Sequence, residues 1–287
     1  MRKRRALSFT RLLSKTKIRA TIFPMQIIVF TGGEAPAPDK AVAYFKNILA
    51  AGQKPDAVIA ADSGLETLRA YQKYFKGLYD FAPSIILGDF DSISDKKILD
   101  EYDGATIERS PSYKDDTDTE MALKRANGIA RNFLQGQKTR GFPNLFGLTN
   151  QKTFVSLIGG AGGRVDHFLS IYNLFGTKIA PDAWLCGEQV LWKAERESFS
   201  VGGLKAGDVI SIARPFGKNH VGKIRSQGLE WESSVFRKNG MPSVSNTIKE
   251  EFARQGRPIQ IEFLRGTFVL IAPLFASVQL NKGSTKK

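Results

Sequence analysis

The sequence predicts an α/β protein in which a parallel sheet flanked by helices is followed by a smaller antiparallel domain. From residue 26 to about 180, short apolar, β-branched runs alternate with helical patterns, as in parallel sheets with helical connections. Several of these runs end at small or acidic residues, where a strand hands over to a loop. After residue 187 the pattern changes to short strands separated by Gly and Pro turns, which indicates antiparallel pairing.

The elements follow from these patterns in chain order. In the first part we expect strands over residues 27–30, 57–60, 85–87 and 154–158. We expect helices over residues 40–51, 65–74, 118–133 and 166–175. Thr117 or a neighbouring carboxylate should cap the third helix. The stretch 135–151, rich in Gly, Asn and Thr, is expected to be a surface loop, and strands of the second part are expected over residues 208–212, 259–263 and 267–271.

These patterns divide the chain into four parts. Residues 1–24 are a basic extension, residues 25–187 the α/β domain, residues 188–280 the antiparallel domain and residues 281–287 a disordered tail. Apolar residues make up 42% of the 287, which is enough for a substantial core. No apolar stretch is long enough to span a bilayer.

The net charge of +14 is concentrated near the N-terminus. Residues 1–24 hold eight of the 42 Lys and Arg residues and no acid, so the rest of the chain carries 34 basic against 28 acidic residues. Binding of nucleic acid would therefore rest on this extension alone. Its composition resembles an organellar transit peptide, but a misread start upstream of Met25 or a disordered tail is favoured, and the protein is expected in the cytoplasm.

The scarcity of Cys and His limits the metal chemistry that is open to the chain. Cys186 is the single cysteine, which excludes an intramolecular disulfide and a multi-cysteine zinc site. His167 and His220 are the two histidines. A bound metal would therefore be held by carboxylates.

Two acidic motifs supply such carboxylates. Asp89 and Asp91 flank Phe90 directly after the apolar run 85–87, at a strand end where open α/β sheets bind ligands. Two carboxylates there could reach one Mg²⁺, although a turn rich in Asp would have the same sequence. The second motif, residues 114–118, precedes a helix, and its three acids are more than a helix cap needs; Asp118 is the expected ligand.

Two further motifs lie at predicted strand ends. Gly159 and Gly160 begin a glycine-rich turn before a helix, where backbone N–H groups could face an anion; Arg164 could pair with phosphate and Asp166 with metal or a ribose hydroxyl. The spacing is neither that of a Walker A loop nor that of a dinucleotide fingerprint. The run 61–64 is, in isolation, a helix cap with a glycine. Together the four strand-end motifs favour a metal nucleotide as ligand.

In the second domain, Trp231 and the turn at Ser245 and Asn246 stand out as an aromatic residue and a small polar cluster. By residue type alone, Trp231 is more often a core residue, and Ser245 and Asn246 are a turn.

Six motifs in this order resemble the thiamine pyrophosphokinase family. They are Ala-Asp-Ser-Gly, Gly-Asp-Phe-Asp-Ser-Ile, Lys-Asp-x-Thr-Asp-x-Glu, Gly-Gly-Arg-x-Asp-His, Gly-Leu-x-Trp and Ser-Asn-Thr. The resemblance covers about residues 25 to 272. The resemblance implies an α/β nucleotide-binding domain followed by a β-sandwich, in a homodimer that holds thiamine between one subunit's first domain and the other's second. Ser63 stands where many relatives have glycine.

The resemblance also implies roles for individual residues. Metal and phosphate chemistry would fall to Asp89, Asp91 and Asp118, with Asp166 as a further catalytic residue. The ATP side would comprise Asp62, Ser63, Gly64, Thr117, Gly159, Gly160 and Arg164. Thiamine would contact Trp231, Ser245 and Asn246, with the indole facing the cationic vitamin.

The implied reaction transfers the diphosphoryl group of ATP to the hydroxyethyl oxygen of thiamine, with Mg²⁺ or alternatively Mn²⁺, and releases AMP. Two other classes compete with this interpretation. A phosphatase with an Asp-x-Asp motif would need no adenine nucleotide, and a nucleic-acid-binding protein would depend on the basic extension.

Overall fold

The computed structural model describes residues 25–50, 52–111, 115–135, 153–215, 222–232 and 243–282. The basic extension, Lys114 and all of the predicted loop 135–151 except Gln135 lie outside these residues. Among the described residues, no helix has both the length and the apolar character that crossing a membrane requires.

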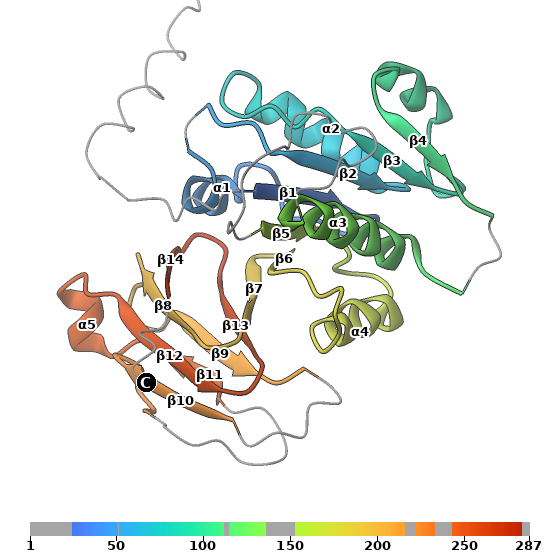
Figure 1. The fold of residues 1–287 in the computed structure, drawn as a ribbon. Coiled ribbons are helices and arrows are strands. Elements are labelled where there is room, and N and C mark those ends of the chain that lie inside the picture. Colours follow the sequence, from blue (N-terminus) through green and yellow to red (C-terminus); the bar gives the residue numbers. More distant parts are fainter. Residues whose placement is uncertain are drawn as a thin grey trace, which may run out of the picture.

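A parallel array of six strands forms one part of a ten-stranded sheet (Figure 1). Its strands are β1 (Met25–Phe30), β2 (Ala57–Ala61), β3 (Ile85–Gly88), β4 (Thr106–Arg109), β5 (Thr153–Ile158) and β6 (Ala183–Cys186). They lie in the order β6-β5-β1-β2-β3-β4, and every neighbouring pair is parallel. Strands that are buried on both faces read as continuous apolar runs, which is why β1 to β3 were visible in the sequence.

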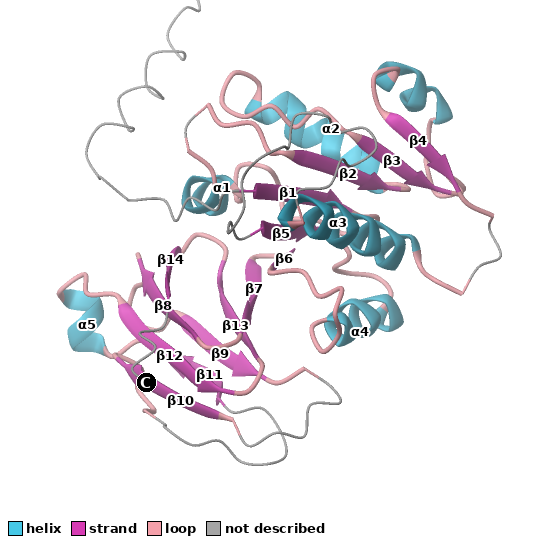
Figure 2. Cartoon of the chain, viewed as in Figure 1, coloured by secondary structure: helices cyan, strands magenta, loops and turns pink. Residues whose placement is uncertain are grey.

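Helices cover both faces of this array (Figure 2). They are α1 (Val42–Ile48), α2 (Gly64–Phe75), α3 (Asp118–Leu134) and α4 (Val165–Leu174), and a short 3-10 helix, η1, covers Lys96–Tyr102. Alternate residues of β1 face opposite sides: Ile28 packs with α1 and α2, whereas Ile27 packs with α3 and α4. The strand periodicity therefore divides the core into two layers around the sheet.

The antiparallel half continues the same sheet and adds a second one. Its elements are β7 (Gln189–Ala194), β8 (Glu197–Gly202), β9 (Val209–Ala213), β10 (Lys223–Gln227), β11 (Ser243–Thr247), α5 (Glu250–Arg254), β12 (Ile259–Arg265), β13 (Phe268–Pro273) and β14 (Ser277–Lys282). The large sheet extends through β7, β13 and β9 to β11, and the four-stranded sheet has the order β10-β12-β8-β14. The two sheets share apolar contacts such as Trp192 against Phe199.

The α/β class with a mixed sheet confirms the broad prediction, and the structure refines its connection. β6 pairs with β7 in antiparallel fashion across the turn at Gly187, so one sheet runs through the predicted boundary between residues 187 and 188. The boundary itself stays a prediction. The predicted start of the disordered tail at residue 281 is wrong, because Asn281 and Lys282 pair with Ser198 and Glu197 at the end of β14.

Candidate active site

The candidate site lies at the carboxyl edge of the parallel strands, where the chain order reverses. β2 and β5 lie on opposite sides of β1, so the chain order reverses at β1, and open α/β sheets bind ligands at such reversal points. The four strand-end motifs of the sequence all fall at this edge or at the helix starts beside it.

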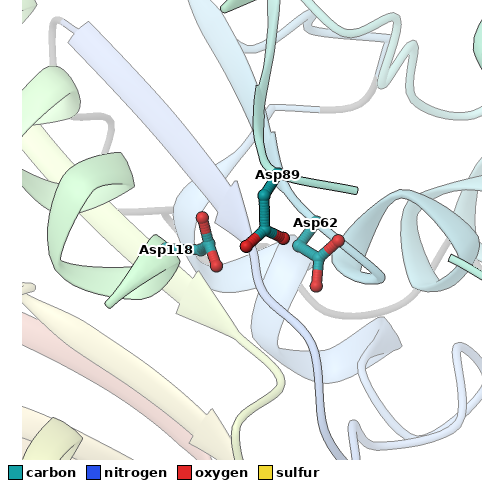
Figure 3. A group of neighbouring side chains, drawn as sticks. All are labelled: Asp62, Asp89 and Asp118. Atoms are coloured by element: carbon teal, nitrogen blue, oxygen red, sulfur yellow. The ribbon is translucent and has the colours of Figure 1, made fainter. Parts of the chain in front are cut away.

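Three carboxylates from three elements meet here (Figure 3). Asp62 follows β2, Asp89 follows β3, and Asp118 is the first residue of α3. One oxygen from each lies within 4.8 Å of the others. Such a set of hard oxygen donors fits Mg²⁺ or Mn²⁺, and no other group of this kind occurs among the described residues.

An unusual backbone brings the carboxylates together. Asp62 and Phe90 have positive φ angles of 49° and 63°, which cost free energy for residues other than glycine. Gly88, at φ 137°, lacks a Cβ that would lie only 3.2 Å from both Asp118 Oδ1 and Asp62 Cβ. The three acids can therefore approach each other because Asp62 and Phe90 have strained backbones and Gly88 has no side chain.

The electrostatics of Asp62 favour a cation at this acid group. Burial raises the pKa of Asp62, hydrogen bonds from the Ser92 hydroxyl and the Ser63 backbone lower it, and the charges of Asp118 and Asp91 raise it again. Its Oδ1 atom is buried and has no hydrogen-bond partner within the described part of the chain. A bound cation would satisfy a buried, unpartnered carboxylate oxygen in a residue whose neighbours are acids.

Asp91 occupies a different position from the one the sequence suggested. Its side chain is exposed and it is not one of the three acids that meet, whereas Asp62, expected on the ATP side, is. The Ser92 hydroxyl lies 3.1 Å from Asp91 Oδ1 and also bonds Asp62 Oδ2, so Asp91 is linked to the cluster through one hydroxyl group. A metal-binding role for Asp91 stays a prediction.

The start of α3 shows how Asp118 is positioned. Thr117 forms a capping box with Glu120: the Glu120 N–H donates to the Thr117 hydroxyl at 3.2 Å, and the Thr117 N–H donates to Glu120 Oε2 at 2.8 Å. The expected cap is confirmed, and an ATP contact of Thr117 remains a prediction. Asp116 pairs with Lys124 at 2.6 Å, so this neighbouring acid is neutralised locally.

Two glycine loops, one after β1 and one after β5, form a wall at the same edge of the sheet. The backbone of residues 31–34 after β1 bonds the loop after β5: the Gly160 N–H donates to the Gly32 carbonyl, and Glu34 and Ala161 exchange two bonds of 2.7 and 3.0 Å. A side chain at Gly159 would overlap the Thr31 carbonyl. The sequence prediction missed the loop 31–34, although its Thr-Gly-Gly directly after an apolar strand was an available signal.

Ser63 and Gly64 join α2 to this wall. A Cβ at Gly64 would lie 2.5 Å from the Phe30 carbonyl oxygen, so only glycine allows α2 to begin this close to β1. The Ser63 hydroxyl lies beside Gly32 in the same way and makes no capping bond to α2. Both residues border the glycine loops, and their contacts with ATP stay a prediction.

Arg164 and Asp166 pair with each other at the start of α4. Their side chains are exposed and lie 2.6 Å apart, and the ion pair lowers the pKa of Asp166 and raises that of Arg164. Asp166 does not belong to the three-acid group. Their predicted contacts to phosphate and metal would require this ion pair to open or to bind the ligand jointly.

Trp231, Ser245 and Asn246 lie together at the far edge of the large sheet. Asn246 is buried and links the two segments: its Oδ1 accepts from the Trp231 N–H at 3.1 Å, and its Nδ2 donates to the Trp231 carbonyl at 2.9 Å. Trp231 is 61% exposed, which excludes the core position that its residue type alone would suggest, and its contact with thiamine stays a prediction. Asn246 thus positions an exposed indole.

Comparison with known proteins identifies relatives of this chain. Residues 50–182 match the family model for the catalytic domain of thiamin pyrophosphokinase, in agreement with the resemblance that the motifs indicated. The matched range contains all three clustered acids. No curated protein matches the chain.

Solved structures share the fold at low sequence identity. Thiamine pyrophosphokinase from Bacillus subtilis is 18% identical with a TM-score of 0.57, and the alignment covers 86% of this chain and 98% of that one. The thiamin pyrophosphokinase from Candida albicans is 15% identical, with a TM-score of 0.58 and coverage of 87% and 89%. The yeast enzyme is 14% identical, with a TM-score of 0.53 and coverage of 87% and 86%.

Proposed function

We propose that this chain, whose residues 50–182 belong to the thiamin pyrophosphokinase catalytic-domain family, transfers the diphosphoryl group of ATP to the hydroxyethyl oxygen of thiamine. The enzyme class, thiamine diphosphokinase, follows from the family match. The products are thiamine diphosphate and AMP. In the geometry of this chain, the proposal is supported above all by the close approach of Asp62, Asp89 and Asp118.

The three acids would hold Mg²⁺, or alternatively Mn²⁺. When bound, the ion neutralises negative charge on the phosphate groups of ATP. The unpartnered Oδ1 of Asp62 supports its inclusion beside Asp89 and Asp118. Ser92, which bonds both Asp62 and Asp91, would keep Asp91 oriented toward the same site.

Apart from holding the metal, the protein would position the two substrates. Phosphoryl-type transfer needs little covalent help, so the protein's task is to align the thiamine oxygen with the β-phosphorus and to exclude competing water. The glycine loops approach the ligand closely because they carry no side chains. Asp118 and Asp166 are the candidate acceptors for the hydroxyl proton.

Thiamine would be bound by the residues at the far sheet edge, and this requires a second subunit. In the large sheet seven strands separate β11, which carries Ser245 and Asn246, from β3, which precedes Asp89. At about 4.8 Å per strand, β11 and β3 are roughly 38 Å apart along the sheet, far more than the length of a vitamin. A homodimer with the active site between subunits would bring the two regions together.

A mixing experiment tests this arrangement. Asp118→Asn and Trp231→Ala subunits are unfolded and refolded together, and activity is assayed with thiamine well below its KM, where each variant alone is expected to have little activity. If each site uses Asp118 from one subunit and Trp231 from its partner, half of the random dimers contain one intact site, and activity recovers to about a quarter of the wild type. Absence of recovery in a dimer that demonstrably exchanges subunits would place both residues in one subunit or remove Trp231 from the site.

The reaction itself is tested by product analysis. The protein is incubated with ATP, Mg²⁺ and thiamine, and AMP and thiamine diphosphate are measured. We expect AMP to appear only when thiamine is present, whereas phosphate release without any nucleotide requirement would indicate a phosphatase. We also propose that the protein acts in the cytoplasm.

A further inference from the structure

We propose that Glu34 binds the ribose hydroxyl groups of the nucleotide and so gives the site its preference for a ribonucleotide. This inference rests on the proposed function, because it assumes that ATP is the co-substrate. Glu34 lies in the loop after β1, at the edge of the sheet where the chain order reverses. That reversal point is where open α/β sheets bind ligands.

The backbone of Glu34 is fixed to the opposing glycine loop. Its N–H donates to the Ala161 carbonyl at 2.7 Å, and its carbonyl accepts from the Ala161 N–H at 3.0 Å. This antiparallel bridge is an isolated one that links two crossover loops. The direction in which the side chain leaves the backbone is thereby set by the fold.

The carboxylate of Glu34 covers the glycine loop at Gly162. Any Cβ at Gly162 would overlap Glu34 Oε2, so this position is open only because it carries no side chain. Arg164, two residues later, pairs with Asp166, and the described residues give Glu34 no ion pair of its own. An exposed carboxylate without a cation, held at the ligand edge, is an acceptor for hydroxyl donors.

The charge of Glu34 decides which end of the nucleotide lies beside it. A carboxylate repels phosphate, so the phosphates are disfavoured over Gly162, even though the loop is rich in glycine. The three clustered acids are the place where a cation could hold the phosphates. The nucleoside end then faces the loops 31–34 and 159–163, where ribose hydroxyls can donate to Glu34.

Binding measurements with deoxynucleotides test the inference. ATP, 2′-deoxy-ATP and 3′-deoxy-ATP are titrated calorimetrically into the full-length protein with Mg²⁺. We expect the wild type to bind at least one deoxynucleotide about tenfold more weakly than ATP, since a hydrogen bond to a charged group is lost. In Glu34→Ala we expect ATP to bind about tenfold more weakly and the discrimination between ATP and that deoxynucleotide to disappear.

A matched control separates the hydroxyl contact from general charge and stability effects. Glu188→Ala removes an exposed acid in the turn between β6 and β7, where it pairs with Lys40 at 3.8 Å. This variant should keep the discrimination of the wild type. A Glu34→Ala protein that still discriminates as the wild type does would overturn the inference, as would a wild type that binds all three nucleotides equally. A wild type that binds no ATP would overturn the proposed function as well.

Discussion

The acid cluster lies toward one end of the large sheet and Asn246 at the other, and their buried polar atoms differ in hydrogen bonding. Asn246 is 1% exposed, and its amide bonds Trp231, Ser243 and Thr247 within the chain. Asp62 is also buried, but its Oδ1 atom has no partner in the described structure, and its neighbours repel it. Satisfied polar groups stabilise a fold, whereas unsatisfied ones indicate where a ligand completes it.

The largest expected effect concerns the acid cluster. Asp118→Asn should lower kcat for thiamine diphosphate formation by about 10³-fold or more, because it removes a charge that would hold the metal over the phosphates. The matched control is Asp116→Asn, which removes the adjacent acid that pairs with Lys124 and should change kcat less than about twofold. Equal losses in the two variants would remove the distinction between the cluster and its neighbours.

The next effect concerns stability at the other end of the sheet. Asn246→Ala should lower the free energy of unfolding by about 2–3 kcal/mol, because the Trp231 and Thr247 backbone groups lose their partners. Urea unfolding measures this change. Ser245→Ala is the control: the Ser245 backbone N–H, and not its side chain, bonds Ser211, so we expect a change below about 0.5 kcal/mol. A neutral Asn246→Ala variant would contradict the positioning role.

Trp231→Ala should weaken thiamine binding without destabilising the fold. The side chain is 61% exposed, so its loss leaves no cavity, but the cationic vitamin loses an aromatic face. We expect the KM for thiamine to rise about tenfold with the KM for ATP unchanged. Phe275→Ala, which removes another exposed aromatic residue, is the control and should leave both constants unchanged. A rise in the KM for ATP alone would indicate that Trp231 contacts the nucleotide and not thiamine.

The smallest effect is a pH-dependent one at Asp62. Its raised pKa means that the folded protein binds this proton more tightly than the unfolded chain does. The free energy of unfolding therefore falls as the pH rises from the ordinary carboxyl pKa through the raised one. The Asp62→Asn variant lacks this pH-dependent decrease in the free energy of unfolding. Asparagine also tolerates the positive φ of this position.

Without divalent metal, Asp62→Asn should therefore be more stable than the wild type at neutral pH by about 1 kcal/mol, and the difference should shrink toward about pH 4. Unfolding curves in urea with EDTA across this range measure it. Addition of Mg²⁺ should stabilise the wild type more than the variant. A variant that is less stable than the wild type at neutral pH would show that Asp62 stabilises the fold without metal.

Local sequence determined the elements that carry the site. Apolar runs predicted β1, β2, β3 and β5 to within about two residues at each end, and Thr117 predicted the start of α3, because strand burial and helix capping depend on neighbours in the chain. The sequence also placed Asp62, Asp89 and Gly159 at strand ends. These are properties that a short segment possesses by itself.

Only the tertiary structure decided which of these residues meet. Asp62 joins Asp89 and Asp118 in one group, and the positive φ angles of Asp62 and Phe90 lie where the chain turns after β2 and β3. The contact between Glu34 and the glycine loop arises because β5 lies beside β1 although more than a hundred residues separate them. Strand order and backbone direction set such distances, and neither is encoded in the spacing of a motif.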